Sequence, residues 1–211
     1  KTLINDVVIM FCLIALSFSF MLFANIQECY VTIISQGHTV NQIFYCFDLF
    51  CYDPSIAFFK ILITFSSIIM FIYIKKNPIA YDISILILIS ILSMLLLLSA
   101  NDLFVVYLTL EAQSLIFCVL IAAKRYSNLA IEAAIKYFIL AAVGSVFFLY
   151  GVSLLYSIFD TTNFILIKSQ IIDTNLDYQL ILAILLVLVA VLFKLAIFPF
   201  HYWIGDVYEG A

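Results

Sequence analysis

The stretch Leu180-Ile181-Leu182-Ala183-Ile184-Leu185-Leu186-Val187-Leu188-Val189-Ala190-Val191-Leu192-Phe193 decides the fold, because this apolar run ends at Lys194 and Pro199 follows five residues later. A lysine ammonium in hydrocarbon costs at least about 2.5–3.5 kcal/mol. A proline breaks a helix close to that charge. An apolar helix, a cation inside it and a helix break together indicate ion or proton movement across a membrane.

The composition extends this interpretation to the whole chain of 211 residues. Hydrophobic residues make up 67% and charged residues 10% of the chain, and the mean hydropathy is +1.25. A soluble domain is about 45–50% apolar and about a quarter charged, so the sequence predicts an all-α integral membrane protein. A basic patch with interleaved aromatic residues is not found in the sequence, which argues against a nucleic-acid partner.

Six segments of the sequence are long and apolar enough to span a bilayer, which takes about 20 mostly apolar residues. These segments form one predicted membrane domain over residues 1–211, and the polar segment Phe159–Asp177 is expected to lie outside the bilayer as a loop with a short strand or interfacial element. The predicted spans are Val7–Ile26, Ser55–Ile74, Ile83–Ala100, Leu103–Ala123, Leu129–Ile158 and Tyr178–Phe200.

The loops between these spans differ in charge. With six spans, one side of the membrane receives Lys1, Lys75, Lys76, Lys124 and Arg125, whereas the loops on the other side are acidic. The positive-inside rule places the basic side in the cytoplasm or the mitochondrial matrix. The amino end is therefore expected on that side.

Glu111 lies near the middle of the fourth predicted span, about 13 Å from Asp102 at a rise of about 1.5 Å per residue. A short glutamate cannot reach an interface from this depth, so the position indicates a functional carboxylate. The alternative is a polar clamp between helices, assisted by Gln113 and Ser114.

Glu132 and Lys136 stand four residues apart in the fifth predicted span, which puts them on one helix face in the favourable order. An interfacial ion pair is the alternative to a functional pair at this position. For Lys194 the alternative is a side chain that snorkels to the interface, and His201 could be an interfacial anchor. Spacing alone leaves a disulfide among the loop cysteines open, and no metal-ligand spacing occurs in the sequence, so a metal site is not expected.

Four blocks of the chain resemble NADH dehydrogenase subunit 2, the antiporter-like membrane subunit of respiratory complex I. Residues 193–211 resemble the family motif F-K-x-x-x-x-P-F-H-x-W-x-P-D-V-Y-x-G-A, with Gly205 where the family usually has proline. Residues 129–140 resemble the L-E-A-x-I-K-Y element. Glu111 stands in a Y/F-x-x-x-E-x-x-S-L context, and Asp53–Phe59 resembles the D-G-F-A-x-x-F entry to an earlier helix.

The resemblance implies specific roles for these residues. Glu111 and Lys194 would be a coupled pair on facing helices, with the lysine at the break of a discontinuous helix. Lys136 would be a second buried lysine on the proton route, with Glu132 beside it, and Glu132 and His201 are secondary candidates. The chain would hold no cofactor of its own, whereas the assembled complex would use FMN, iron–sulfur clusters and ubiquinone in other subunits.

The resemblance also implies a location and partners. The chain would be a multi-pass protein of the mitochondrial inner membrane, with lipids and other membrane-arm subunits of complex I around it. The abundance of Phe and the scarcity of Gly suggest an AT-rich genome, organellar or otherwise. Because the family pattern continues beyond Ala211, a separate polypeptide from a split gene, or a truncation, would account for the carboxyl-terminal half. The functional alternatives are a subunit of a multi-subunit sodium/proton antiporter and a structural membrane subunit that does not pump.

Overall fold

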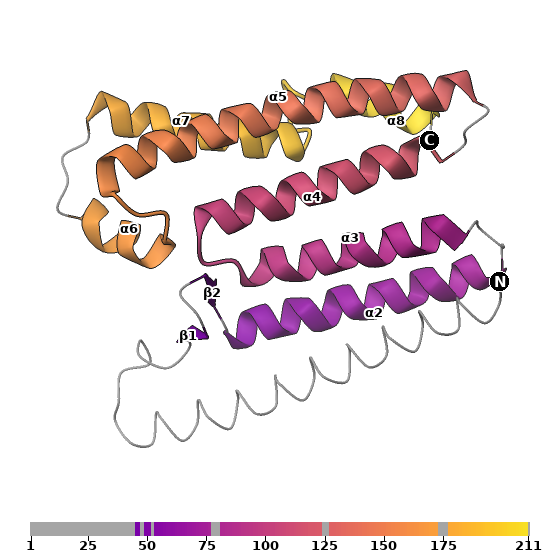
Figure 1. Ribbon diagram of the computed structural model, residues 1–211, viewed down its shortest axis with the longest axis horizontal. Helices are drawn as coiled ribbons and strands as arrows, with labels where there is room; N and C mark the ends of the chain where they lie inside the picture. The colour runs from indigo at the N-terminus through magenta and orange to yellow at the C-terminus, as the bar shows by residue number, and fades with distance from the viewer. Residues whose placement is uncertain are drawn as a thin grey trace, which may run out of the picture. The chain divides into compact units, whose positions relative to one another are not determined.

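Helices dominate the computed structural model, which describes residues 45–46, 49–51, 53–76, 81–123, 127–172 and 177–210 (Figure 1). The chain divides into two compact units, Lys1–Ala100 and Asn101–Ala211. The first predicted span, Val7–Ile26, lies outside the described residues. The other five predicted spans each overlap a helix, the sixth only as far as Lys194, and the described residues confirm the all-α fold.

The described part of the first unit is a short hairpin followed by two packed helices. Strands β1 (Tyr45–Cys46) and β2 (Phe50–Cys51) pair antiparallel with Cys46 opposite Phe50, and helices α2 (Pro54–Lys76) and α3 (Tyr81–Ser99) follow. Helix α2 begins at a proline, whose missing N–H costs nothing in the first turn. The Asp53 carbonyl accepts the first helical hydrogen bond, from the Ala57 N–H at 3.0 Å.

Small polar side chains are buried between α2 and α3. Thr64 and Ser67 of α2 and Ser90 and Ser93 of α3 are at most 6% exposed. Each hydroxyl donates to a backbone carbonyl three or four residues earlier in its own helix, at 2.7–3.0 Å. A hydroxyl satisfied in this way can face hydrocarbon or another helix at little cost, and its small size lets the two helices approach closely.

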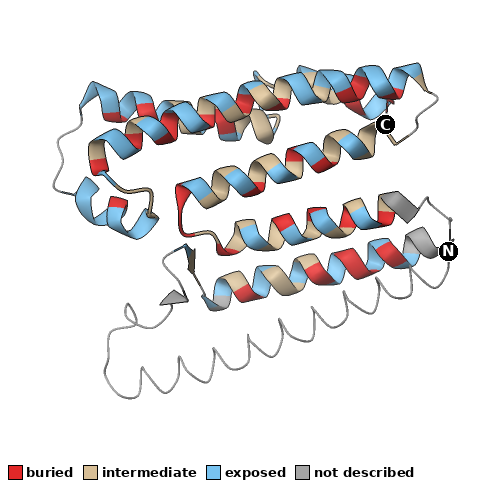
Figure 2. Cartoon of the chain, viewed as in Figure 1, coloured by how far each residue is buried: buried red, intermediate tan, exposed pale blue. Residues whose placement is uncertain are grey.

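The second unit is a bundle of five helices built around α5. Helix α5 packs against α4, α7 and α8. A core cluster that includes Phe148, Leu155 and Ala183 is formed by buried residues of α4, α5, α6 and α7, and Figure 2 shows buried positions along the helices. The helices are α4 (Leu103–Ile121), α5 (Asn128–Phe159), α6 (Phe164–Ile171), α7 (Tyr178–Lys194) and α8 (Tyr202–Gly210).

Two glycines of α5 allow α7 to lie close to it. A side chain at Gly151 would stand 2.8 Å from Val187 Cγ2 and 3.0 Å from the Ala183 carbonyl oxygen. One at Gly144 would meet the Phe193 ring at 3.4 Å. Apolar helices in membranes associate through such close backbone approach, because lipid supplies little hydrophobic drive between them.

A polar corner joins the start of α4 to the segment between α5 and α6. Asp102 caps α4 by accepting from the Phe104 N–H at 2.7 Å, and its second carboxylate oxygen accepts from the Thr162 hydroxyl at 2.7 Å. Asn163 caps α6 in the same manner. The segment 159–177, expected to be a loop with a short strand or interfacial element, therefore contains a two-turn helix, which its own asparagine cap begins.

Many large apolar side chains of the described helices are exposed. Phe65 of α2 and Val146 of α5, for example, are 59% and 66% exposed. Among the described helices, α2, α4 and α5 are long and apolar enough to cross a membrane, and α3 and α7 contain shorter apolar stretches. Apolar outer faces and small buried residues are the reverse of the pattern in water, so the structure confirms an integral membrane protein.

The sixth predicted span differs from the observed structure at its carboxyl end. It was expected to run from Tyr178 to Phe200, but α7 ends at Lys194 and α8 begins at Tyr202. The chain between them contains Pro199, which cannot continue a helix past the preceding turn. The predicted discontinuity is therefore present, and it starts directly after the lysine.

Candidate functional site

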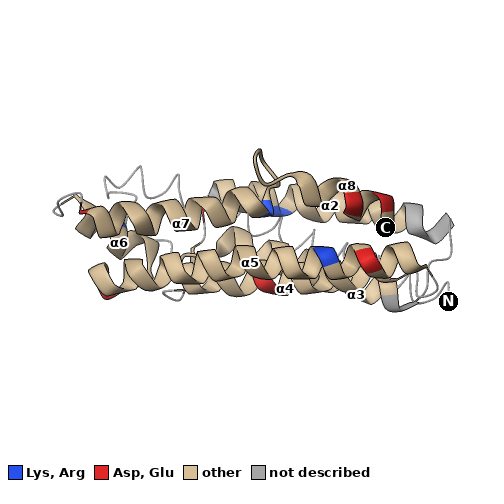
Figure 3. Ribbon diagram, turned by 90° about the horizontal axis from the view of Figure 1, so that it is seen from above, with Lys and Arg blue, Asp and Glu red and all other residues tan. Residues whose placement is uncertain are grey.

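Charged side chains are scarce on the helices of the second unit, as Figure 3 shows. Those inside α4, α5, α7 and α8 are Glu111, Glu132, Lys136, Lys194, Asp206 and Glu209. They fall into two groups, one around Glu111 and Lys194 and one around Lys136.

Glu111 and Lys194 line the same small cavity between α4, α5 and α7. Glu111 Oε2 and Lys194 Nζ are both buried, and neither has a hydrogen-bonding partner among the described residues. Buried charged groups without partners are costly, so few are found in native proteins. Two opposite charges left unsatisfied in one cavity therefore indicate a site, because ordinary packing would satisfy or remove them. The other lining residues are Tyr107, Leu110, Gly144, Ser145, Phe148 and Ala190.

The cavity is small and mostly apolar. Its open space is about 10 Å³, which is close to the minimum for one water molecule. Tyr107 and Phe148, which both line the cavity, stack with their ring centroids 6.3 Å apart. One water has room to lie near both charged groups, whereas a hydrated ion would not fit without movement of the walls.

The polar clamp considered for Glu111 is not formed by Ser114. The Ser114 hydroxyl donates at 2.8 Å to the backbone carbonyl of Glu111, within α4. It does not use the carboxylate, and Glu111 Oε2 remains without a partner among the described residues. This arrangement leaves the carboxylate available to a group in the cavity.

The helix break follows directly on Lys194. The Leu195 N–H still donates to the Val191 carbonyl at 2.9 Å, but Ala196 has a left-handed φ of 49° and the Ile197 N–H reaches back to Leu192 at 3.1 Å. The Phe198–Pro199 peptide bond is cis. The last carbonyls of a helix carry partial negative charge, so Lys194 lies at the end of α7 that favours a cation.

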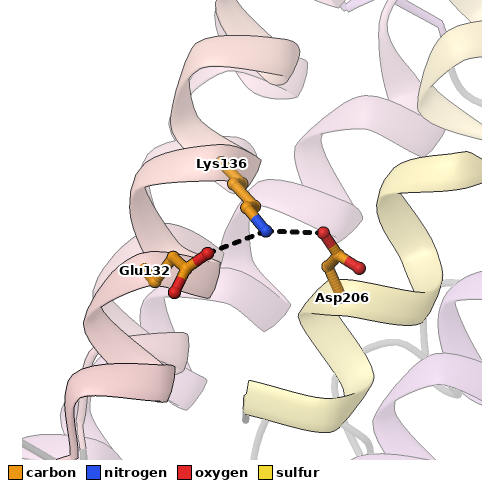
Figure 4. A network of polar contacts seen from close by, with 3 residues as sticks. All are labelled: Glu132, Lys136 and Asp206. Carbon is orange, nitrogen blue, oxygen red and sulfur yellow. Dashed lines mark hydrogen bonds and ion pairs between the residues drawn. The ribbon is translucent and has the colours of Figure 1, made fainter.

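Lys136 is the centre of the second group (Figure 4). Its ammonium lies 2.9 Å from Glu132 Oε1 in the same helix and 2.7 Å from Asp206 Oδ2 in α8. The side chain is 44% exposed in this chain, so Lys136 is not the buried lysine that the resemblance implied. Glu132 and Lys136 form the expected pair within α5, but the shorter contact joins two helices.

Helix α8 lies close to α5 next to this ion pair. A side chain at Gly210 would collide with the Ala133 methyl group and approach the Leu129 carbonyl oxygen at 2.8 Å. The rings of Tyr137 and Trp203 are in contact, with centroids 5.5 Å apart. Trp203 Nε1 is buried without a hydrogen-bonding partner among the described residues.

His201 lies in the break and is exposed. Its ring contacts Phe198 and Tyr202, with centroids 5.8 and 5.6 Å away, and it lines neither of the two cavities. Sequence reasoning missed Asp206 as the partner of Lys136, because the two residues are separated by 70 positions. Within the described residues, no group of three or more His, Cys, Asp or Glu side chains could hold a metal ion.

The second unit corresponds closely to a known family. Residues 100–211, more than half of the chain, match the family model described as NADH:quinone oxidoreductase/Mrp antiporter, TM. The chain belongs to this family. NADH-ubiquinone oxidoreductase chain 2 of Marchantia polymorpha is 38% identical over 183 residues, which cover 81% of this chain and 36% of that protein. NADH-quinone oxidoreductase subunit N 1 of Rhizobium meliloti is 36% identical over 167 residues, covering 77% and 35%.

Chains in solved structures of respiratory membrane complexes share the fold. A chain of the archaeal membrane-bound sulfane sulfur reductase aligns with all of this chain at a TM-score of 0.79 and 23% identity, over 43% of its own length. A chain of respiratory complex I from Thermus thermophilus aligns with all of this chain at a TM-score of 0.66 and 24% identity, over 47% of its length. This chain spans a little over a third of the length of the curated relatives that it matches.

Proposed function

We propose that this chain is part of a proton-translocating membrane-arm subunit of NADH:quinone oxidoreductase, and that Glu111 and Lys194 are its proton-transfer pair. The observation that carries the proposal is the cavity in which both groups are buried without partners among the described residues. The names of the curated relatives, subunit N and chain 2 of this enzyme, support the same complex.

The chemistry of the pair follows from its burial. An ammonium and a carboxylate in a low-dielectric cavity can exist as two charges or, after one proton moves from Nζ to Oε2, as two neutral groups. Desolvation favours the neutral state, whereas mutual attraction favours the charged state. A small change in separation or hydration therefore shifts the balance, and a single water between the two groups would provide the path for the proton.

Lys136 and Glu132 form the second part of the proposal. Their ion pair lies along the same helix, α5, that lines the first cavity through Gly144 and Ser145. We assign to Lys136 the role of a further proton-binding residue on the route, which becomes available when its ion pairs separate. His201, at the helix break, is a weaker candidate for the same role. The driving redox chemistry, with FMN, iron–sulfur clusters and quinone, would belong to other subunits of the complex.

The proposed location is the mitochondrial inner membrane, with the amino end on the matrix side. The Marchantia relative is named as the ubiquinone-reducing enzyme's chain 2, and the basic loops support the orientation through the positive-inside rule. The proposed partners are lipids and the neighbouring membrane-arm subunits, including whatever polypeptide supplies the remainder of the subunit.

The test is to replace each member of the pair in the assembled complex. With Glu111→Gln or Lys194→Ala, we expect NADH oxidation to continue while the number of protons moved per electron falls, measured as NADH-driven acidification of inverted membrane vesicles. Gln113→Ala, on the same helix, is the matched control and should leave the ratio unchanged. An unchanged ratio in both pair variants would overturn the proposal and support a structural subunit.

Sodium/proton antiport is the second candidate. The matching family model includes Mrp antiporters, and a chain of the Mrp complex from Dietzia sp. shares the fold at a TM-score of 0.68 and 20% identity, over 99% of this chain and 43% of that one. Dependence of the vesicle pH gradient on sodium, at constant ionic strength, would favour this alternative. Equal gradients in sodium and potassium media would exclude it.

A further inference from the structure

Asp206 connects the two charged groups described above. It forms the shorter of the two contacts of Lys136, at 2.7 Å, and it belongs to α8, which follows Lys194 after only the segment 195–201. We propose that Asp206 is a positioning residue: by holding α8 against α5, it keeps Lys194 in place opposite Glu111. The proposal rests on the proposed proton-transfer role of that pair.

Asp206 and Glu132 contribute differently to the ion pairs of Lys136. Asp206 links α8 to α5, whereas Glu132 balances the Lys136 charge within α5. Glu132 and Lys136 are one turn apart on α5, so their pair forms whether or not α8 is near. The Asp206 contact exists only when α8 lies on α5. Loss of the Asp206 charge therefore releases α8 without leaving the Lys136 ammonium unpaired.

Close packing makes α8 sensitive to this link. Gly210 and Val207 are buried on the side where α8 meets α5, and Gly210 has no room for a side chain against Ala133. The rings of Tyr137 and Trp203 add a further contact between the two helices. With α8 packed this closely, the ion pair of Asp206 and Lys136 sets where along α5 the helix lies.

Movement of α8 must be passed on to Lys194. The segment 195–201 is held by its own hydrogen bonds, among them Ile197 N–H to Leu192 and Phe200 N–H to Ile197 at 2.8 Å, and by ring contact between Phe193 and Phe200 at 5.4 Å. These contacts connect the break to the last turn of α7, where Lys194 lies. A shift of α8 is therefore expected to move the Lys194 ammonium within a cavity that has room for one water at most.

The experiment compares Asp206→Asn with Glu209→Gln in the assembled complex. Glu209 lines the same cavity of about 140 Å³ as Lys136 and Asp206 but is outside the two ion pairs of Lys136, so its variant removes an equal charge and leaves the link intact. We expect Asp206→Asn to lower the rate of proton translocation by about tenfold, since misplacement of a reacting group by about 1 Å can cost up to about 100-fold in rate. Glu209→Gln should behave as the native complex.

Two further variants separate positioning from a general loss of structure. Asp206→Glu keeps the charge and should restore most of the translocation. In a Lys136→Gln background, Asp206→Asn should have no further effect, because residues that act through one contact are not additive. Normal pumping by Asp206→Asn, or effects of Asp206 and Lys136 that multiply, would overturn the positioning role.

Failure of the positioning role can be distinguished from failure of the proton-transfer pair itself. If Glu111→Gln and Lys194→Ala leave pumping unchanged, the proposed function fails whatever Asp206 does. If those variants abolish pumping and Asp206→Asn is indistinguishable from Glu209→Gln, the proposed function stands and the positioning role is wrong.

Discussion

Replacement of Gly151 by alanine should separate α5 from α7. The new Cβ would lie 2.8 Å from Val187 Cγ2, and 3.0 Å from both the Val187 backbone nitrogen and the Ala183 carbonyl oxygen. The valine methyl group could yield only by a change of its restricted rotamer. The two backbone atoms cannot yield at all unless one helix moves.

The expected magnitude is the difference between two opposing effects. Overpacking of a close contact costs about 1–3 kcal/mol, and alanine in place of glycine in a helix gains up to about 1 kcal/mol. The net loss is then about 1 kcal/mol, which lowers the melting temperature of a domain of this size by roughly 2–4 °C. Because α5 and α7 also line the Glu111 and Lys194 cavity, pumping should fall as well.

The matched control is Gly144→Ala, about two turns from the tight contact on the same face of α5. Its Cβ would meet only Phe193 side-chain atoms, at 3.4–3.6 Å, which an aromatic ring can accommodate. Thermal denaturation of the purified complex should therefore show Gly144→Ala at or above the native midpoint and Gly151→Ala below it. If Gly151→Ala melts at the same temperature as Gly144→Ala or higher, the close approach of α5 and α7 is wrong.

Three other predictions concern a cap, a strained residue and a thiol. Asp102→Ala should destabilise the complex by about 1–3 kcal/mol in thermal denaturation, because it removes two side-chain hydrogen bonds. Asp177→Ala should cost little stability, because Asp177 is an N-cap without a side-chain hydrogen bond. Ala196→Gly should raise the melting temperature slightly, because the left-handed conformation at φ 49° costs a non-glycine residue about 1–2 kcal/mol; a lower melting temperature would contradict this. Partial burial and the Asp53 carboxylate raise the pKa of the Cys51 thiol, which reduces its thiolate fraction at pH 8. Alkylation of Cys51 by iodoacetamide should therefore be slower than alkylation of a peptide thiol, and Asp53→Asn should accelerate the alkylation.

The helices could be predicted from the sequence because their signals are local. The polar pair Asn101-Asp102 interrupts the apolar sequence directly before α4, and Pro199 together with Lys194 marked the break, since a proline and a charge act on the turn in which they occur. The end of α7 could be predicted less well. The residues 195–200 are apolar apart from their proline, so hydropathy extends the span beyond the last residue that is helical.

Contacts between distant residues could not be predicted in the same way. Asp206 lies 70 positions from Lys136, and its pairing depends on the packing of α8 against α5, which no local pattern encodes. Glu132 was recognised because its partner is one turn away. For the same reason the sequence suggested a pair formed within α5, whereas the structure adds the contact that joins α5 to another helix.

Lys136 and Lys194 differ in their surroundings, and this difference suggests that the two lysines have different roles. Lys136 has two carboxylates within 2.9 Å, so its charge is balanced and its contacts are suited to holding helices together. Lys194 Nζ is buried with no hydrogen-bonding partner among the described residues, and it shares its cavity with Glu111 Oε2, which likewise has none. A group that gains or loses a proton must be close to balance between its two states, and strong pairing removes that balance. These surroundings therefore favour Lys194 as the proposed proton carrier, and they suit Lys136 to the proposed link with α8 through Asp206.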